Sequence, residues 1–119
     1  MDHHAFNQFC ASLTASTYVM QWGGAHVWKV GGKVFAIGFT VKDDKPAFTF
    51  KTSDQNYYFL CESEGYRPAP YFANRGMKWI QQTDTSASTS QDLQYYLLES
   101  YQLVYSGVSK RKQGELGLL

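Results

Sequence analysis

Apolar residues near the N-terminus of this chain recur with the period of a helix. They occupy positions i, i+3, i+4 and i+7, one stripe of an amphipathic helix over residues 3–15: Phe6, Phe9, Cys10 and Leu13. Between residues 18 and 52 the pattern changes to β-branched and aromatic runs, separated by two Gly-Gly pairs and an Asp-Asp-Lys-Pro turn. Because Gly-Gly readily adopts the positive φ angles of a two-residue hairpin turn, this region predicts four antiparallel strands.

A short helix and a loop are predicted next. Ser53 is a favourable N-cap for a helix that runs to about residue 62, and Gly65 ends it. Residues 66–71 contain two prolines, each of which lacks a backbone donor and disfavours helical geometry in the residue before it. We therefore interpret residues 66–71 as a non-helical segment, the proline loop.

The remaining pattern predicts one more strand and a long helix. Residues 77–82 form the strand, and a Ser/Thr-rich loop over residues 83–90 leads to the helix, which ends at Gly107. The helical stripe consists of Leu93, Tyr96, Leu97, Tyr101 and Val104. We assign residues 1–109 to a single domain and residues 110–119 to a C-terminal tail.

The element order α-β-β-β-β-α-β-α predicts an α+β fold, with an antiparallel sheet of about five strands and helices on one face. Bulky residues alternate with smaller ones in the third and fourth strands, so we expect the bulky set to face a single core. That core is predicted to contain Phe9, Leu13, Phe35, Ile37, Phe39, Phe48, Phe50, Leu60, Leu97 and Val104.

Length and composition restrict the class of protein. A chain of 119 residues has the size of one domain, and its 17% aromatic residues and 18% charged residues exclude disorder for most of its length. Polar residues interrupt the uncharged stretch between Asp2 and Lys29, so it does not predict a membrane span. The N-terminus lacks the cationic start of a signal peptide, and we expect a cytoplasmic protein.

Charge is segregated along the chain, although the formal net charge is only +1. Residues 3–42 contain three lysines and no acid, and residues 65–83 contain Arg67, Arg75 and Lys78 and no acid. The two predicted helices that follow the sheet meander are acidic. We therefore expect the hairpin tips and the loop before the last strand to form a positive rim that contacts phosphates. Several aromatic residues near this rim could stack on exposed bases, although most of the rings are needed for packing.

Catalytic and metal-binding motifs are not found in the sequence. It contains no G-x-S-x-G, no G-x-x-x-x-G-K, no H-E-x-x-H and no G-x-G-x-x-G before a helix. His3, His4 and His26 have no metal-ligand spacing, and Cys10 and Cys61 are expected to be buried thiols. We predict no catalytic residue, no metal and no cofactor, and thus a protein that is not an enzyme.

Short motifs in a consistent order resemble the MmcQ/YjbR family over about residues 13–112. They are KVGGKVFA at 29–36, FKTS at 50–53, RP at 67–68, NR at 74–75, KW at 78–79 and SYQLV at 100–104 before a glycine. The resemblance implies a fold similar to CyaY, the bacterial frataxin homologue, and a double-wing mode of DNA binding. An iron-handling role by analogy with frataxin is disfavoured, because the first helix and the following strands lack an acidic ridge.

Two functional hypotheses remain open. The first is weak DNA binding with low sequence specificity, by a monomer, through Lys29, Lys33, Arg67, Tyr71, Arg75 and Lys78. The alternative is a protein-interaction or small-ligand-binding module. Its aromatic groove would lie between the proline loop and the sheet, lined by Trp28, Tyr71 and Trp79. Neither hypothesis involves a membrane.

Overall fold

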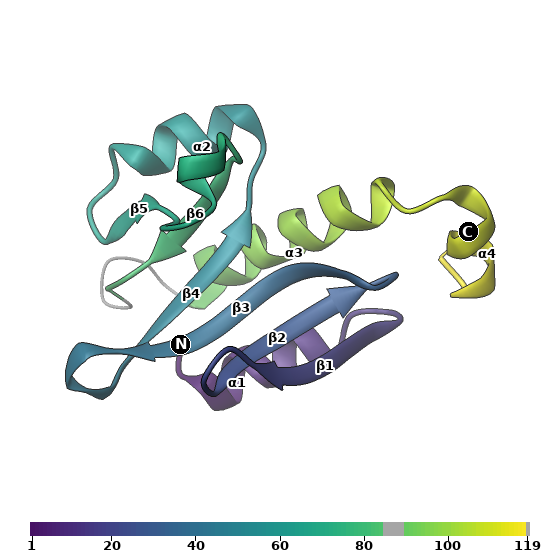
Figure 1. The fold of residues 1–119 in the computed structure, drawn as a ribbon, viewed down its shortest axis with the longest axis horizontal. Helices are drawn as coiled ribbons and strands as arrows, with labels where there is room; N and C mark the ends of the chain where they lie inside the picture. The colour runs from purple at the N-terminus through teal and green to yellow at the C-terminus, as the bar shows by residue number, and fades with distance from the viewer. Residues whose placement is uncertain (85–89, 119) are drawn as a thin grey trace.

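A computed structural model describes residues 1–84 and 90–118 of the chain. Six antiparallel strands form one open sheet in the order β1-β2-β3-β4-β6-β5 (Figure 1). The strands are β1 (Ser16–Gln21), β2 (Ala25–Val30), β3 (Lys33–Val41), β4 (Lys45–Lys51), β5 (Tyr66–Pro68) and β6 (Trp79–Gln82). The α-helices are α1 (His3–Ala11), α2 (Asp54–Cys61), α3 (Ser90–Ser106) and α4 (Lys110–Glu115). The predicted α+β class is confirmed.

The four-stranded meander has the predicted hairpins. Gly23 and Gly24 connect β1 to β2, and Gly31 and Gly32 connect β2 to β3, all four with positive φ angles. These angles are the reason for glycine at both turns. The chain therefore reverses where its glycine pairs lie.

The proline loop contributes a strand that the sequence did not predict. Residues 66–68 form β5, which pairs with β6 at the edge of the sheet and raises the number of strands from about five to six. Pro68 is compatible with this position, because an edge strand can lack a ladder donor on its open side. The element order is thus extended by one short strand.

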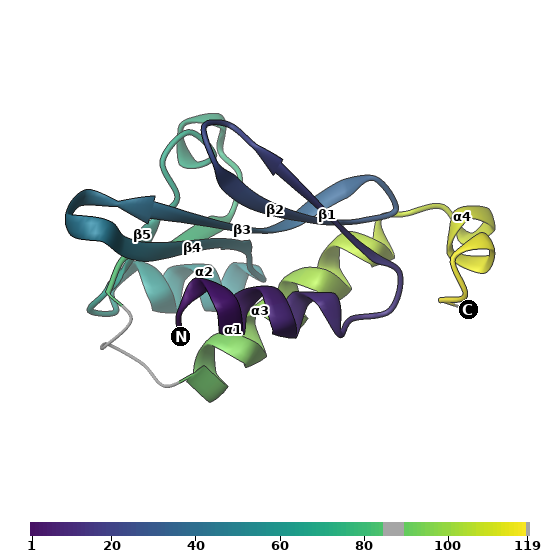
Figure 2. The same ribbon diagram turned by 90° about the horizontal axis from the view of Figure 1, so that it is seen from below.

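Helices α1, α2 and α3 all cover the same face of the sheet, and Figure 2 shows the other face turned away from them. Asp2 caps α1 by accepting from the Ala5 N–H at 2.8 Å, and Ser53 caps α2 as predicted. The first helix is shorter than residues 3–15. It ends at Ala11, and Ala15 has a φ of 62° that no right-handed helix allows.

The C-terminal region contains both predicted and unexpected structure. Strand β6 and helix α3 correspond to the predicted last strand and long helix. The segment expected to be a tail forms α4, whose first turn is capped by the Ser109 hydroxyl. The Ser/Thr-rich loop predicted over residues 83–90 lies mainly outside the described residues.

A β-bulge at Phe35 divides the bulky residues of β3 between the two faces of the sheet. Trp28 of β2 pairs with Ala36, whereas the next residue, Lys29, pairs with Val34, so that Phe35 is an extra residue. Phe35 consequently points toward the helices together with Ala36, its neighbour. Ile37 points to the opposite face.

The prediction of a single core is therefore wrong for two residues. The main cluster lies between the sheet and the helices and includes Phe6, Phe35, Phe48, Phe50, Leu60, Leu97 and Val104, with Phe9 and Leu13 packed against it. A second, smaller cluster of Ala25, Val27 and Ile37 lies on the face away from the helices, and Phe39 packs against it. Strict alternation across β3 predicted one face, and the bulge breaks that alternation.

We expect His3 to make stability depend on pH. Burial lowers the pKa of its imidazole below the ordinary 6.5, and His26, whose ring centroid lies 5.0 Å away, lowers it further, while Asp2 opposes the shift. The fold thus favours neutral His3. This contribution is present above about pH 6.5 and is lost as the pH falls toward the lower folded-state pKa.

Urea unfolding at about pH 7.5 and about pH 5.5 measures this effect. The wild type should lose more stability between the two values than His3→Asn. The control is His4→Asn, because His4 is exposed. An equal loss in the wild type and the His3 variant would contradict the assignment.

Candidate functional site

The sheet carries basic residues and no acid, and two of the three helices that cover it, α2 and α3, are acidic. The strands contain no Asp or Glu, and their basic residues are Lys29, Lys33, Lys45, Lys51 and Arg67. Helices α1, α2 and α3 contain no Lys or Arg; α2 carries Asp54, α3 carries Asp92 and Glu99, and α1 carries no acid. Charge therefore differs between the two faces of the sheet.

Strand register places most of the strand cations on one face. Lys29 lies opposite Val34, Lys51 opposite Trp79, and Arg67 opposite Gln81. The four cations Lys29, Lys45, Lys51 and Arg67 alternate with side chains of the main core and point away from the helices. We call this side of the sheet the open face.

A groove of about 760 Å³ lies on the open face. One side is formed by the turn between β1 and β2, and the other by residues 70–72, which follow β5. Figure 2 shows the β1–β2 turn and the segment after β5 both rising from the sheet on the side away from the helices. The lining residues are Trp22, Gly23, Gly24, Ala25, Ile37, Phe39, Thr40, Thr49, Arg67, Pro70, Tyr71, Phe72 and Gln81.

Two sides of the groove carry exposed aromatic rings. Trp22 is 66% exposed and Tyr71 is 60% exposed, which is unusual for rings of this size. Their φ angles are 50° and 75°, respectively, in the left-handed region that ordinary side chains rarely occupy. Such strain persists where the surrounding structure imposes it, and it clusters at binding sites.

Arg75 and Phe72 hold the segment around Tyr71 in place. The Arg75 guanidinium lies 4.5 Å from the centre of the Tyr71 ring, and Phe72 stacks on Trp79 with centroids 4.6 Å apart and planes 13° from parallel. Trp79 is itself buried on β6. The side of the groove formed by residues 70–72 is therefore anchored to the sheet.

The floor of the groove combines apolar and polar side chains. Ala25, Ile37 and Phe39 supply its apolar part. Thr49 and Gln81 lie side by side on β4 and β6, each 2% exposed. Arg67 Nε donates to Gln81 Oε1 at 2.8 Å, which fixes the orientation of both side chains.

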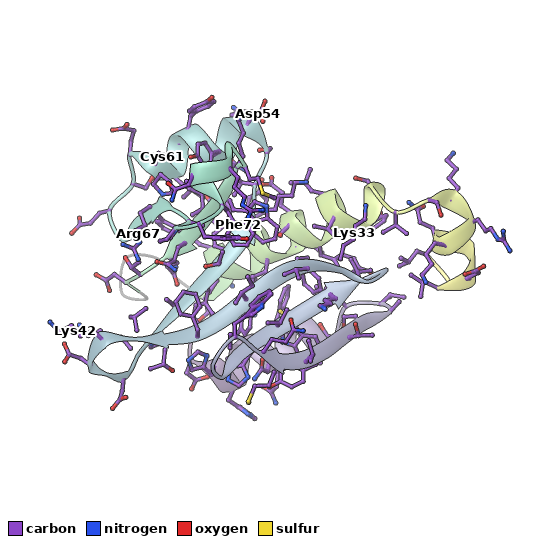
Figure 3. The ribbon with its side chains drawn as sticks, in the orientation of Figure 1. Lys33, Lys42, Asp54, Cys61, Arg67 and Phe72 are labelled. Atoms are coloured by element: carbon purple, nitrogen blue, oxygen red, sulfur yellow. The ribbon has the colours of Figure 1, made fainter. Side chains whose placement is uncertain are left out.

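The predicted basic rim is not a single surface. Figure 3 shows Arg67 and Lys33 on either side of Phe72, and Lys33 Nζ donates to the Gly107 carbonyl at the end of α3 at 3.1 Å. Lys78 lies 3.8 Å from the Asp54 carboxylate, near the Tyr58 ring. Of the predicted contact residues, Lys29 and Arg67 lie on the open face, and Tyr71 and Arg75 lie at one wall of the groove.

The predicted groove between the proline loop and the sheet is present with a different lining. Tyr71 lines it as predicted. Trp28 lies on the helix side, where its Nε1 donates to Asn7 of α1 at 2.9 Å. Trp79 supports Phe72 from behind and does not line the groove.

Sequence reasoning missed four residues of this region. Trp22, Thr49 and Gln81 line the groove, and Lys51 lies on the open face. The position of Trp22 directly before a Gly-Gly hairpin turn was the available signal, since such a residue lies at an exposed tip.

Cysteines, histidines and acids form no metal site in the described part of the chain. No group of three or more of these residues is placed to hold an ion there. Cys10 is buried, which raises the pKa of its thiol, and Cys61 is half-buried; both are free thiols. Of the helices in residues 1–84 and 90–118, none has the length and apolar character needed to cross a membrane.

Comparison with known proteins identifies the family and the fold. The YjbR family model matches residues 11–103, well over half of the chain. A Deinococcus radiodurans protein with a DUF419 domain has a TM-score of 0.83 and 22% identity, and the match covers 98% of this chain and 88% of that one. A Pseudomonas syringae protein has a TM-score of 0.71 and 14% identity, over 87% of this chain and 99% of that one. No curated protein matches the sequence.

Proposed function

This chain belongs to the YjbR family, and from that premise we propose that it binds nucleic acid, without catalysis, across the open face of its sheet. The observation that carries the proposal is the charge difference between the two faces. Four of the five strand cations, Lys29, Lys45, Lys51 and Arg67, point away from the helices, and the strands contain no acid. Because phosphate contacts dominate nucleic-acid affinity, a nearly neutral protein needs such a local surface to bind.

The open face also supplies aromatic surface. Trp22 and Tyr71 are exposed on the same side as Lys29, Lys51 and Arg67. Cations that contact the backbone, next to rings that can stack on bases, are the combination used by proteins that bind nucleic acid with little sequence preference. The catalytic motifs sought in the sequence are missing, so we assign the face no reaction.

We expect DNA binding to be weak and to decrease steeply with salt. A log–log plot of affinity against salt concentration should have a slope of about −0.9 for each phosphate neutralised on a duplex. The double variant Lys29→Gln, Lys51→Gln should weaken binding and flatten the slope by about two units. Fluorescence anisotropy with labelled DNA at several salt concentrations measures both quantities.

The control removes the same charge elsewhere. Lys42 lies in the η1 turn (Lys42–Asp44) beside two aspartates, and Lys110 begins α4. The double variant Lys42→Gln, Lys110→Gln should leave the slope nearly unchanged. Equal effects of the two double variants would indicate generic attraction, and no binding at low salt would contradict the proposal.

A small-ligand-binding module is the second candidate, and the groove favours it. Its volume of about 760 Å³ falls within the range of small-molecule sites, and its apolar floor with few polar groups is typical of them. Such a module would bind no oligonucleotide in the salt titration. That result would make the groove, and not the lysines, the centre of the function.

A further inference from the structure

We propose that the groove on the open face is a pocket for one unstacked base of a single-stranded nucleic acid. This inference rests on the proposed function and makes it more specific, because it names the form of nucleic acid and the part of it that is recognised. The phosphates would lie along Lys29 and Lys51. The base would enter between Trp22 and Tyr71.

The shape of the groove fits a planar ring. Exposed aromatic side chains stand on two sides, and the apolar floor of Ala25, Ile37 and Phe39 lies between them on β2 and β3. The groove is roomy enough for a base with its sugar. A base stacked on an aromatic side chain needs no particular sequence, but it must leave its own stack first.

The polar end of the groove is rich in hydrogen-bond donors. Because Gln81 Oε1 accepts from Arg67 Nε, the terminal N–H groups of Arg67 and the amide N–H groups of Gln81 remain as donors among the residues that the structure describes. No other hydrogen bond or ion pair of the Arg67 side chain occurs among residues 1–84 and 90–118. Donors of this kind match the carbonyl oxygens of thymine, uracil and guanine, whereas adenine has none.

Single strands are favoured over duplexes for a geometric reason. The groove lies between two walls that rise from the open face, so a ligand must project a group into it to reach Thr49 and Gln81. In a duplex each base is stacked and paired, and it would have to be flipped out at a cost in free energy. A single strand presents its bases without most of that cost.

Two groove variants and two matched controls test the proposal. Trp22→Ala and Tyr71→Ala remove the exposed rings of the groove. Tyr58→Ala and Tyr95→Ala are the controls, because these rings are 63% and 59% exposed on helices α2 and α3. All four residues are largely exposed, so the variants should fold, and circular dichroism checks this.

The probes are labelled oligothymidylate, oligoadenylate, a thymidylate strand with abasic sites, and a duplex. We expect oligothymidylate to bind more tightly than the other three. Each groove variant should weaken oligothymidylate binding by about fivefold or more without changing its salt slope, and should leave binding to the abasic strand unaffected. The control variants should change neither affinity. Binding should also quench the fluorescence of Trp22, a signal absent in Trp22→Phe.

The outcomes separate this inference from the proposed function. Equal binding of duplex, abasic strand and oligothymidylate, with a slope that still depends on Lys29 and Lys51, would overturn the base pocket and leave phosphate binding intact. Binding to none of the probes at low salt would overturn both. A preference for oligoadenylate that the groove variants abolish would overturn the donor argument.

Discussion

Phe50→Ala should destabilise the protein by about 3–5 kcal/mol, the range for a large aromatic side chain removed from a core. Phe50 is fully buried in the main cluster, and its ring stacks on Tyr96 of α3 with centroids 5.8 Å apart. Removing the ring leaves a cavity between the sheet and α3 that the neighbouring side chains cannot fill. Urea unfolding, compared with the wild type at constant m-value, measures the loss.

Phe39→Ala is the variant to compare with Phe50→Ala. The bulge at Phe35 leaves Phe39 half-buried on the open face, so its removal should cost only about 1 kcal/mol. Alternation without a bulge predicts equal, large losses for the two phenylalanines. A Phe39 loss as large as that of Phe50 would therefore show that the faces of β3 are assigned incorrectly.

Ser100→Ala should cost about 1–3 kcal/mol, which is large for the loss of one oxygen atom. The buried Ser100 hydroxyl donates to the Phe35 carbonyl at 2.5 Å and accepts from the Lys51 N–H at 2.9 Å. It thereby joins α3 to the bulged residue of β3 and to the end of β4. Alanine would leave a buried carbonyl and a backbone N–H without these partners.

Ser106→Ala is the control for this prediction. Ser106 belongs to the same helix, but its side chain is exposed and donates to Leu103 within the last turn. Its replacement should change the free energy of unfolding by no more than about 0.5 kcal/mol. Hydrogen exchange at Lys51 should also accelerate in Ser100→Ala and not in Ser106→Ala. Similar losses in the two variants would contradict the bridging role of Ser100.

The sequence by itself determined the features that depend on neighbouring residues. Glycine pairs predicted the hairpin turns, because positive φ angles are a local property of the chain. Ser53 predicted the start of α2 through a bond to a residue three positions away. The sequence also contained the charge segregation, since acids are missing from all six strands.

The candidate site was predicted only in part. Arg67 was recognised from its acid-free basic segment and Tyr71 from its position in the proline loop, and both line the groove. Thr49 and Gln81 were not, because each is an ordinary strand residue until the pairing of β4 with β6 sets them side by side. Trp22 lines the same groove, although its hairpin lies far from Tyr71 along the chain.

Only the tertiary structure decided which face each strand residue occupies. An alternating pattern assigns strand residues to the correct face as long as the pairing of the strands is uninterrupted. One inserted residue reverses the assignment for the residues on one side of the insertion. At Phe35 that insertion depends on pairing with β2 and on the hydroxyl of Ser100, 65 residues away. Strand β5 likewise exists because β6 offers a free edge for pairing, although the prolines near β5 disfavour regular secondary structure. Such long-range contacts leave no local pattern in the sequence. They bring basic and aromatic residues from separate segments together on one face of the sheet, with a groove between them.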